Sequence, residues 1–269
     1  MNIRFIPFNE VSAEIWAQFV DECDECWIYH RPELIRINLE DSRSFAIYED
    51  HKIVGVCVVY VNKIMFGKVL GSRTGPAGLA LKKNISKKIY PLVLEHLRKL
   101  AKMNDCLAIQ MSLSRLSKVN LDVDYLSSYL GRLGFSLGER YFGTDYLPSY
   151  TSIIDLSKTF EDISNDFSHS AKEKCTRFSK QEYQYASFAM DVTIKNWEEF
   201  VANHRATFEL TDATPFSKKM TDSLRELVQN NLALLINVHV EGACCASLYL
   251  MTYKSRAFYF ASGVRPEFY

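Results

Sequence analysis

The stretch Ser44–Ser72 reads SFAIYEDHKIVGVCVVYVNKIMFGKVLGS and contains three apolar runs separated by short polar segments. Runs of this length that are rich in valine, isoleucine and aromatic residues are typical of β-strands. We expect strands at 44–49, 53–61 and 64–72. The segments 50–52 and 62–63 supply the turns. The stretch therefore predicts an antiparallel meander near the start of the chain.

Alternating helices and strands follow this meander. Residues 86–103 place Ile89, Val93, Leu97 and Ala101 on one face of a predicted amphipathic helix. The sequence then predicts a strand at 105–114, a helix at 123–134 that ends at a glycine, and a strand at 135–142. This first α/β unit ends near Pro148. A helix at 11–20 precedes it.

A second meander lies in the other half of the chain, at residues 232–263. It reads LALLINVHV, the turn EG, ACCASLYLMTY, the turn KSR, and AFYFASG. The two stretches share strand lengths and turn placement and lie about 190 residues apart, which indicates an internal duplication. A strand at 186–194 and helices at 159–181, 196–208 and 217–230 precede the second copy.

The duplication predicts two tandem α/β domains, residues 1–148 and 149–269. Each is expected to be a mixed, mostly antiparallel sheet flanked by helices. The second copy has no counterpart of the helix–strand–helix–strand portion that follows the first meander, so we expect it to be incomplete at its C-terminus. Such a sheet would expose an unpaired edge and an apolar face.

The composition is that of a globular protein in a reducing compartment. The chain has 269 residues, 48% hydrophobic and 24% charged, with a formal net charge of zero. No apolar run reaches the roughly 20 residues of a membrane span, and no signal peptide is apparent. Seven cysteines are scattered without the pattern of a disulfide framework. We expect a cytoplasmic protein.

The spacing Cys23-x-x-Cys26 raises the question of a zinc site or a redox pair. A structural zinc site needs four ligands, and no second pair of comparable spacing is present. Acidic neighbours such as Asp24 and Glu25 are expected to raise the thiol pKa, which disfavours a redox pair. The two cysteines are therefore interpreted as unrelated residues near the end of a helix. No histidine-rich metal spacing occurs either, so no metal is expected, and His96 and His239 are interpreted as structural.

Three stretches resemble the Fem-type aminoacyl transferases, which belong to the GNAT N-acyltransferase superfamily. SRTGPAG at 72–78 is similar to the family's Gly-Pro turn. The segment 150–180, YTSIIDLSKTFEDISNDFSHSAKEKCTRFSK, is similar to its domain junction, and residues 241–263 are similar to its second-domain hairpin. The resemblance implies tandem GNAT-like domains. It also implies an enzyme, from bacteria, that adds an aminoacyl or acyl group to an amine of a cell-envelope, peptidoglycan-type precursor.

The resemblance also implies substrate-binding residues. Lys174, Arg177 and Lys180 recur every three residues and project from one side of a helix, which suits a diphosphate. In Fem-like proteins an arginine of this segment holds the acceptor's nucleotide-sugar diphosphate, and Arg177 is the matching position. Further candidates are Arg73, Gly75, Pro76 and Trp27. No residue stands out as the general base, so the catalytic residues are unassigned.

The sequence departs from the family at the residues expected to contact substrate and at the loop expected to bind coenzyme A. Thr74 separates Arg73 from Gly75, and Leu79 stands where the family has an aspartate. The loop Q/R-x-x-G-x-G/A, which binds the coenzyme A pyrophosphate in GNAT enzymes, is absent. We expect no permanently bound cofactor; aminoacyl-tRNA or acyl-CoA is the expected donor, and tRNA a candidate partner.

Two alternatives remain beside the Fem-like enzyme. One is an acetyl-CoA-dependent GNAT N-acetyltransferase that acts on a small amine or amino sugar. The other is an inactive, truncated copy that serves as a binding module. The sequence does not indicate an oligomeric state.

Overall fold

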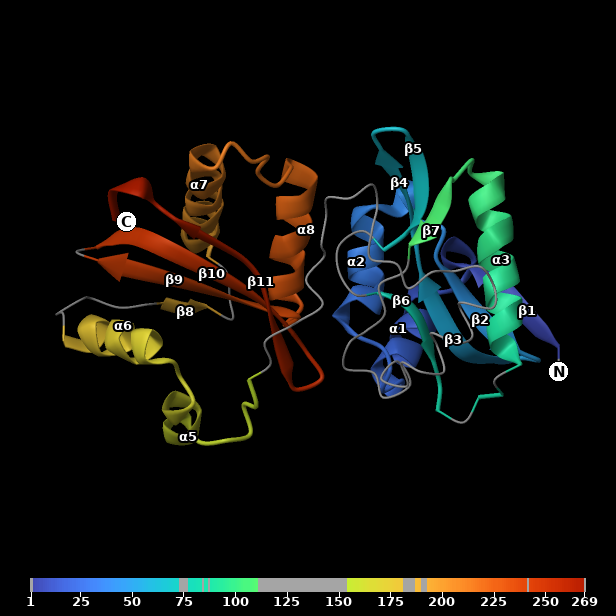
Figure 1. The fold of residues 1–269 in the computed structure, drawn as a ribbon, viewed down its shortest axis with the longest axis horizontal. Helices are drawn as coiled ribbons and strands as arrows, with labels where there is room; N and C mark the ends of the chain where they lie inside the picture. Colours follow the sequence, from blue (N-terminus) through green and yellow to red (C-terminus); the bar gives the residue numbers. More distant parts are fainter. Residues whose placement is uncertain are drawn as a thin grey trace.

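The computed structural model describes residues 2–72, 77–83, 85–86, 88–110, 154–180, 187–189, 193–240 and 242–268. Within them the chain forms three sheets flanked by helices (Figure 1). The predicted mixed α/β fold with mostly antiparallel sheets is confirmed. The predicted elements at 123–134 and 135–142, and the predicted boundary at 148/149, lie outside the described residues.

The N-terminal half, coloured blue to green in Figure 1, contains two sheets, and a series of short helices lies between its first and second strands. Its elements are β1 (Ile3–Pro7), η1 (Phe8–Glu10), α1 (Ala13–Glu22), η2 (Ile28–His30), α2 (Pro32–Ile37), η3 (Leu39–Asp41), β2 (Phe45–Glu49), β3 (Lys52–Val58), β4 (Tyr60–Ile64), β5 (Gly67–Gly71), β6 (Gly78–Leu81), α3 (Ile89–Met103) and β7 (Ala108–Gln110). One sheet has the order β1-β2-β3-β6, and the other has the order β4-β5-β7. The pair β5–β7 is parallel.

Strand β2 supplies side chains to both faces of the first sheet. Phe45 and Ile47 pack with Val93 and Leu97 of α3, whereas Ala46 belongs to the apolar cluster on the α1 and α2 side. Successive residues of a strand point to opposite faces, so this apolar run fits a strand that is covered on both sides. The helix predicted at 86–103 forms as α3, which begins at Ile89.

The predicted strand at 53–61 is wrong in one respect, because it breaks at Val59 into β3 and β4. The Ser44 hydroxyl accepts a hydrogen bond from Val59 N (3.2 Å) and donates one to Val59 O (3.3 Å). Arg43 N also donates to Val59 O, at 2.8 Å. These bonds replace a regular ladder partner at Val59. The third strand also differs, since the turn falls at Met65–Phe66 instead of 62–63.

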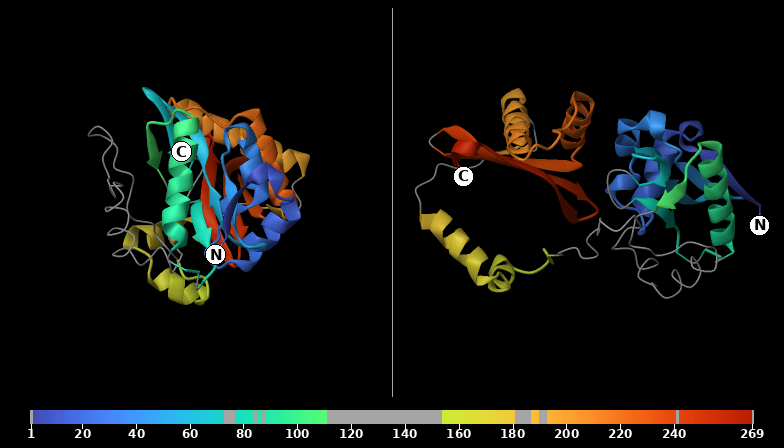
Figure 2. Two further views of the ribbon diagram at one scale, coloured as in Figure 1. Left: turned by 90° about the vertical axis from the view of Figure 1, so that its right-hand side faces the viewer. Right: turned by 45° about the horizontal axis from the view of Figure 1, so that its top comes forward.

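The C-terminal half, coloured yellow to red, holds one sheet and two helix pairs. Its elements are α5 (Phe160–Asn165), α6 (His169–Lys180), β8 (Ser187–Ala189), α7 (Ile194–Leu210), α8 (Lys218–Gln229), β9 (Ala233–Val240), β10 (Ala243–Tyr253), β11 (Arg256–Val264) and η4 (Pro266–Phe268). The sheet has the antiparallel order β11-β10-β9-β8. Figure 2 shows α7 and α8 over one face of it. The strands of the second meander and its turn at Lys254–Ser255 are confirmed; Glu241, in the other predicted turn, lies outside the described residues.

The helix predicted at 159–181 forms as two helices that meet at residues 166–168. The Thr159 hydroxyl accepts from Asp162 N and caps α5, and the Ser168 hydroxyl accepts from Ala171 N and caps α6. A serine that caps a new helix start favours a break over a continuous helix. Helices α7 and α8 begin in the same way, at Thr193 and Ser217.

One apolar cluster runs from the N-terminal half into the C-terminal half. It includes Trp16 and Tyr29 on one side and Leu224 and Tyr249 on the other, all of them buried. The two halves are therefore packed against each other through a continuous core. Burial of aromatic and aliphatic side chains, at about 25 cal/mol per Å², is the main force that holds such a contact.

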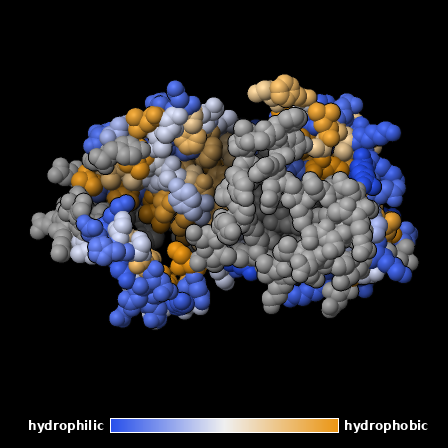
Figure 3. Space-filling model, in the orientation of Figure 1, coloured by the Kyte–Doolittle hydropathy of each residue, from blue (hydrophilic) through white to orange (hydrophobic). Residues whose placement is uncertain are grey.

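Apolar side chains also remain at the surface. Met65 and Phe66, at the turn between β4 and β5, are 88% and 80% exposed, and this turn forms the light-orange projection at the top of Figure 3. Apolar residues also gather over the C-terminal sheet on the same face of the molecule. Among the described residues, none of the helices has the length and apolar character needed to cross a bilayer.

Candidate functional site

The predicted site residue Trp27 lies where the two halves meet. Its side chain is only 5% exposed. The ring packs edge-on to Tyr253 with 6.4 Å between the centroids, and the Arg256 guanidinium lies 5.8 Å from the Trp27 centroid. Trp27 is thus a packing residue of the junction in this structure, and its substrate-binding role stays a prediction.

Beside Trp27, a polar arrangement fixes the junction. The Arg31 guanidinium donates to both carboxylate oxygens of Asp21, at 2.7 and 2.9 Å, and to both oxygens of Glu33, at 3.1 and 2.7 Å. Tyr253 donates to the same Asp21. Burial and Asp21 raise the pKa of Tyr253. Because two carboxylates neutralise Arg31, this arrangement is suited to holding the halves together and not to binding an anion.

Lys254, in the turn between β10 and β11, reaches the end of helix α1. Its Nζ donates to the carbonyl oxygens of Val20 and Cys23, each at 2.6 Å. A cation at a helix C-terminus satisfies carbonyls that lack a partner within the helix. Burial lowers the pKa of Lys254. The turn of one half therefore caps a helix of the other.

The neighbouring Cys23 and Cys26 are both buried and free. The expectation that the acidic neighbours raise both thiol pKa values is wrong for Cys23. A hydrogen bond from Cys26 lowers the pKa of Cys23 to about 7, whereas burial raises the pKa of Cys26 well above its usual range. The reason is that the hydrogen bond between the two thiols affects the pKa of Cys23 more strongly than the acidic side chains nearby do.

The remaining predicted residues lie in two places. Lys174, Arg177 and Lys180 are all in helix α6, so the helical setting expected for them is confirmed. Lys174 is exposed, and the side chains of the other two are not in the described part of the chain. Arg73, Gly75 and Pro76 also lie outside the described residues. Lys174 and Trp27 are far apart in the sequence, and the structure gives no contact between them.

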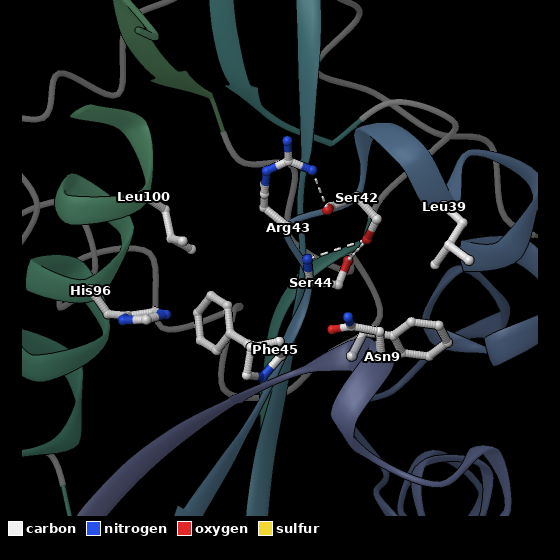
Figure 4. A pocket seen from close by; sticks show the side chains of 10 residues that line it. Asn9, Leu39, Ser42, Arg43, Ser44, Phe45, His96 and Leu100 are labelled. Carbon is white, nitrogen blue, oxygen red and sulfur yellow. Dashed lines mark hydrogen bonds between the residues drawn. The ribbon is translucent and has the colours of Figure 1, made fainter. Parts of the chain in front are cut away.

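A pocket of about 410 Å³ opens in the N-terminal half between α3 and the residues that precede β2. Figure 4 shows His96 and Leu100 projecting from α3 on one side and Leu39 on the other, with Arg43, Ser44 and Phe45 between them. Pockets of roughly 300–1,000 Å³ accommodate small ligands or part of a larger one. The sequence did not point to these residues, because they come from separate elements and carry no motif.

The pocket combines an aromatic wall with a cation. The His96 ring stacks on Phe5 (4.3 Å, 10°) and meets Phe45 edge-on (4.6 Å, 79°). Burial and the nearby Lys99 lower the pKa of His96. Its imidazole is therefore neutral at pH 7 and able to accept a hydrogen bond or a proton.

Arg43 contributes the positive charge. Its Nε donates to Asn104 Oδ1 at 2.8 Å, and one terminal nitrogen donates to the carbonyl oxygens of Glu40 and Ser42. These acceptors are neutral, so the described contacts do not offset the positive charge of the Arg43 guanidinium. The arrangement suits a ligand with an apolar body and an anionic or carbonyl group.

The sheets, the flanking helices and the paired halves together form a fold that is also seen in a solved structure. A solved structure, the crystal structure of FemX, matches all of this chain and 81% of its own chain, with a TM-score of 0.70 and 13% sequence identity. Identity this low shows a shared fold and nothing about the reaction.

Two acetyltransferase structures match about half of the chain. Glucosamine-6-phosphate N-acetyltransferase from Arabidopsis thaliana covers 54% of this chain and 99% of its own, with 14% identity and a TM-score of 0.39. An aminoglycoside acetyltransferase from an uncultured soil metagenomic sample covers 55% and 98%, with 18% identity and a TM-score of 0.39. TM-scores this low do not establish a common fold. No family model matches the sequence, and no curated protein matches it.

Proposed function

We propose that this protein is a Fem-like N-acyltransferase. It transfers an aminoacyl or acyl group to an amine of a cell-envelope, peptidoglycan-type precursor, and aminoacyl-tRNA or acyl-CoA is the donor. The single observation that carries the proposal is the Fem-like fold over the whole length of the chain. The fold raises the expectation of N-acyl transfer by analogy, so the assignment rests on the test below.

Within this proposal, helix α6 binds the acceptor's diphosphate. Lys174, Arg177 and Lys180 lie in one helix, and Lys174 is exposed. An arginine fork binds two phosphate oxygens at once, and lysines add charge. Arg73, Gly75 and Pro76 are proposed to line the same path, and residues 1–148 and 149–269 to be the two units between which the substrates meet.

We propose that the pocket at Arg43 and His96 binds one group of a substrate. Its cation and neutral imidazole suit a carboxylate or carbonyl that is attached to an apolar or aromatic portion. The reaction requires a neutral amine and stabilisation of the developing oxyanion. No general base is assigned here.

The test is a transfer assay with the full-length purified chain. Aminoacyl-tRNA or acetyl-CoA is offered as donor with a nucleotide-linked muramyl peptide as acceptor, and mass spectrometry measures the mass added to the acceptor. Transfer from aminoacyl-tRNA supports the Fem-like enzyme. Transfer from acetyl-CoA to small amines instead supports the GNAT acetyltransferase. No product from either donor, in a preparation that melts cooperatively, counts against an enzyme.

Variants locate the acceptor. Arg177→Ala is expected to weaken acceptor binding at least tenfold, about 1.4 kcal/mol. Lys172→Ala is the matched control on the same helix, because the Lys172 amine is already bonded to the carbonyl of Asn165.

At the pocket, Leu39→Trp is expected to obstruct the opening and raise KM. Leu92→Trp, at a similarly exposed leucine of α3, leaves KM unchanged. Equal effects in each pair contradict the assignment.

A further inference from the structure

A cluster of polar side chains is enclosed between helix α7 and strands β9 and β10, away from the residues that the proposed function uses. Its members are Glu199 and Asn203 of α7, Asn237 and His239 of β9, and Cys244 and Ser247 of β10. In Figure 1, α7 lies over these strands. Asn203, Asn237, Cys244 and Ser247 are each at most 3% exposed. A cluster of this many buried polar side chains calls for a structural or functional explanation.

The strand register brings four of these residues to one face of the sheet. His239 is paired with Cys244, and Asn237 with Ser247. The pairing shifts between Cys244 and Ala246, which is the irregularity of a β-bulge at Cys245. Without a bulge, residues three apart in a strand point to opposite faces. The bulge therefore lets Cys244 and Ser247 face α7 together.

Three of the side chains carry atoms that bind metals. The Glu199 carboxylate, a ring nitrogen of His239 and the Cys244 sulfur lie within 4.8 Å of one another. His239 Nε2 is 3.1 Å from Glu199 Oε2. Glu199 and His239 are 40 residues apart in the sequence, so no short sequence motif indicates that they lie together. The side chains of Glu199 and His239 are 15% and 17% exposed, which leaves solvent a route to the cluster.

A chain of hydrogen bonds leads to two of these three groups. Arg265 Nε donates to Asn203 Oδ1 at 3.1 Å, which turns the Asn203 amide nitrogen toward Ser247 Oγ (2.8 Å) and Cys244 Sγ (3.3 Å). Sulfur thus accepts a hydrogen bond from a fully buried amide. Burial raises the pKa of the Cys244 thiol, and the hydrogen bonds from Asn203 and Ser247 act in the opposite direction, toward the thiolate that binds metals.

The same chain of bonds continues to the carboxylate. Ser247 Oγ donates to Asn237 Oδ1 at 2.8 Å, which turns the Asn237 amide nitrogen toward the backbone oxygen of Asn196 (2.9 Å) and toward Glu199 Oε2 (3.4 Å). Lys195 lies 3.9 Å from the other carboxylate oxygen and is 78% exposed. Outer hydrogen bonds of this kind orient the ligands of metal sites.

We propose that Glu199, His239 and Cys244 bind a zinc-type divalent cation. A thiolate, an imidazole and a carboxylate are the donors that Zn²⁺ takes, whereas Mg²⁺ and Ca²⁺ take oxygen ligands alone. On binding, the Cys244 thiol releases its proton to solvent, and the His239 ring carries its proton on Nδ1, so that Nε2 is free to bind the cation. The Glu199–His239 hydrogen bond then gives way to two metal–ligand bonds. Three protein ligands leave the fourth tetrahedral position to water on the exposed side.

The experiment is a titration of the full, EDTA-treated chain with Co²⁺, under a phosphine reductant. Thiolate ligation of Co²⁺ gives a charge-transfer band in the near ultraviolet, and tetrahedral geometry gives intense visible bands. We expect saturation at one equivalent, reversal by one equivalent of Zn²⁺, and a higher melting temperature with Zn²⁺ than with Mg²⁺. A wild-type chain that shows neither the bands nor the shift overturns the proposal.

Matched variants assign the ligands. Cys244→Ser should abolish the charge-transfer band, whereas Cys175→Ser, which alters an exposed cysteine of α6, should leave it intact. His239→Gln and Glu199→Gln should each weaken Co²⁺ binding at least tenfold. A band that persists in a folded Cys244→Ser chain, or that is lost in Cys175→Ser, contradicts the site. If Cys244→Ser does not fold, the wild-type titration and His239→Gln still decide.

Discussion

The hydroxyl of Tyr253 donates a 2.6 Å hydrogen bond to Oδ1 of Asp21, which joins strand β10 to helix α1 across 232 residues of sequence. The same carboxylate accepts two bonds from Arg31, and the Tyr253 ring packs on Trp27. A polar group that is shared by both halves, surrounded by aromatic rings, fixes how the halves meet.

Tyr253→Phe removes this hydroxyl and keeps the ring. Because Arg31 still neutralises Asp21, we expect a loss of about 1 kcal/mol in the free energy of unfolding. Urea denaturation measures it. Tyr259→Phe is the control, since that residue is 60% exposed and its hydroxyl bonds Ser262 of the same strand. Equal stability of Tyr253→Phe and wild type contradicts a role for the bond.

Lys254→Met removes the cation that caps helix α1 and keeps an apolar chain of similar length. Two carbonyl oxygens lose their donor, so we expect a loss of about 1–2 kcal/mol in the free energy of unfolding. Lys219→Met is the control. Lys219 also joins the halves, through Glu40, but both side chains are more than half exposed, and such pairs contribute about 0–1 kcal/mol. The prediction fails if Lys219→Met costs as much as Lys254→Met.

The buried His30 makes the protein sensitive to acid. Burial lowers the pKa of His30 to about 4, from an ordinary value of 6.5. The unfolded chain therefore takes up a proton at a higher pH than the folded chain does. The resulting stabilisation is complete above about pH 6.5 and is lost as the pH falls toward 4.

Between pH 7 and pH 5 this histidine is expected to lower the free energy of unfolding by about 2 kcal/mol. His30→Asn is the comparison, because it keeps an oxygen for the Trp27 N–H that now bonds Nδ1 at 3.0 Å but does not titrate. Urea titrations at the two pH values should show a shallower pH dependence in the variant. Parallel pH profiles are the outcome that rules the assignment out.

Gly263 of β11 is expected to tolerate no side chain. A Cβ there would lie 2.4 Å from Asn203 C and from His204 N, and these are backbone atoms of α7. Gly263→Ala must push α7 off the sheet, at a cost of about 1–3 kcal/mol or more in the free energy of unfolding. Ser262→Ala, one residue away and partly exposed, is the control and should change stability by less than about 0.5 kcal/mol. If Gly263→Ala is also this mild, α7 is free to shift.

The predicted elements succeeded where their signals are local. The strands of the second meander were predicted almost to the residue, because the alternation of apolar residues and the turn at Lys254–Ser255 depend on neighbouring residues. Lys254 and Ser255 both have φ near +50° (49° and 57°), as a tight hairpin turn requires. The break at Val59 was missed, since its cause is a serine 15 residues earlier in the chain.

The candidate sites divide in the same way, into features that neighbouring residues set and features that packing sets. The sequence by itself determined the mixed α/β architecture, the second meander and the helix that carries Lys174, Arg177 and Lys180, because hydrophobic periodicity and helix caps act over a few residues. Only the tertiary structure decided the pocket at Arg43 and His96, the Asp21–Tyr253 junction and the Glu199–His239–Cys244 cluster. Their members come from elements distant in sequence, and packing alone sets the distances on which their chemistry depends.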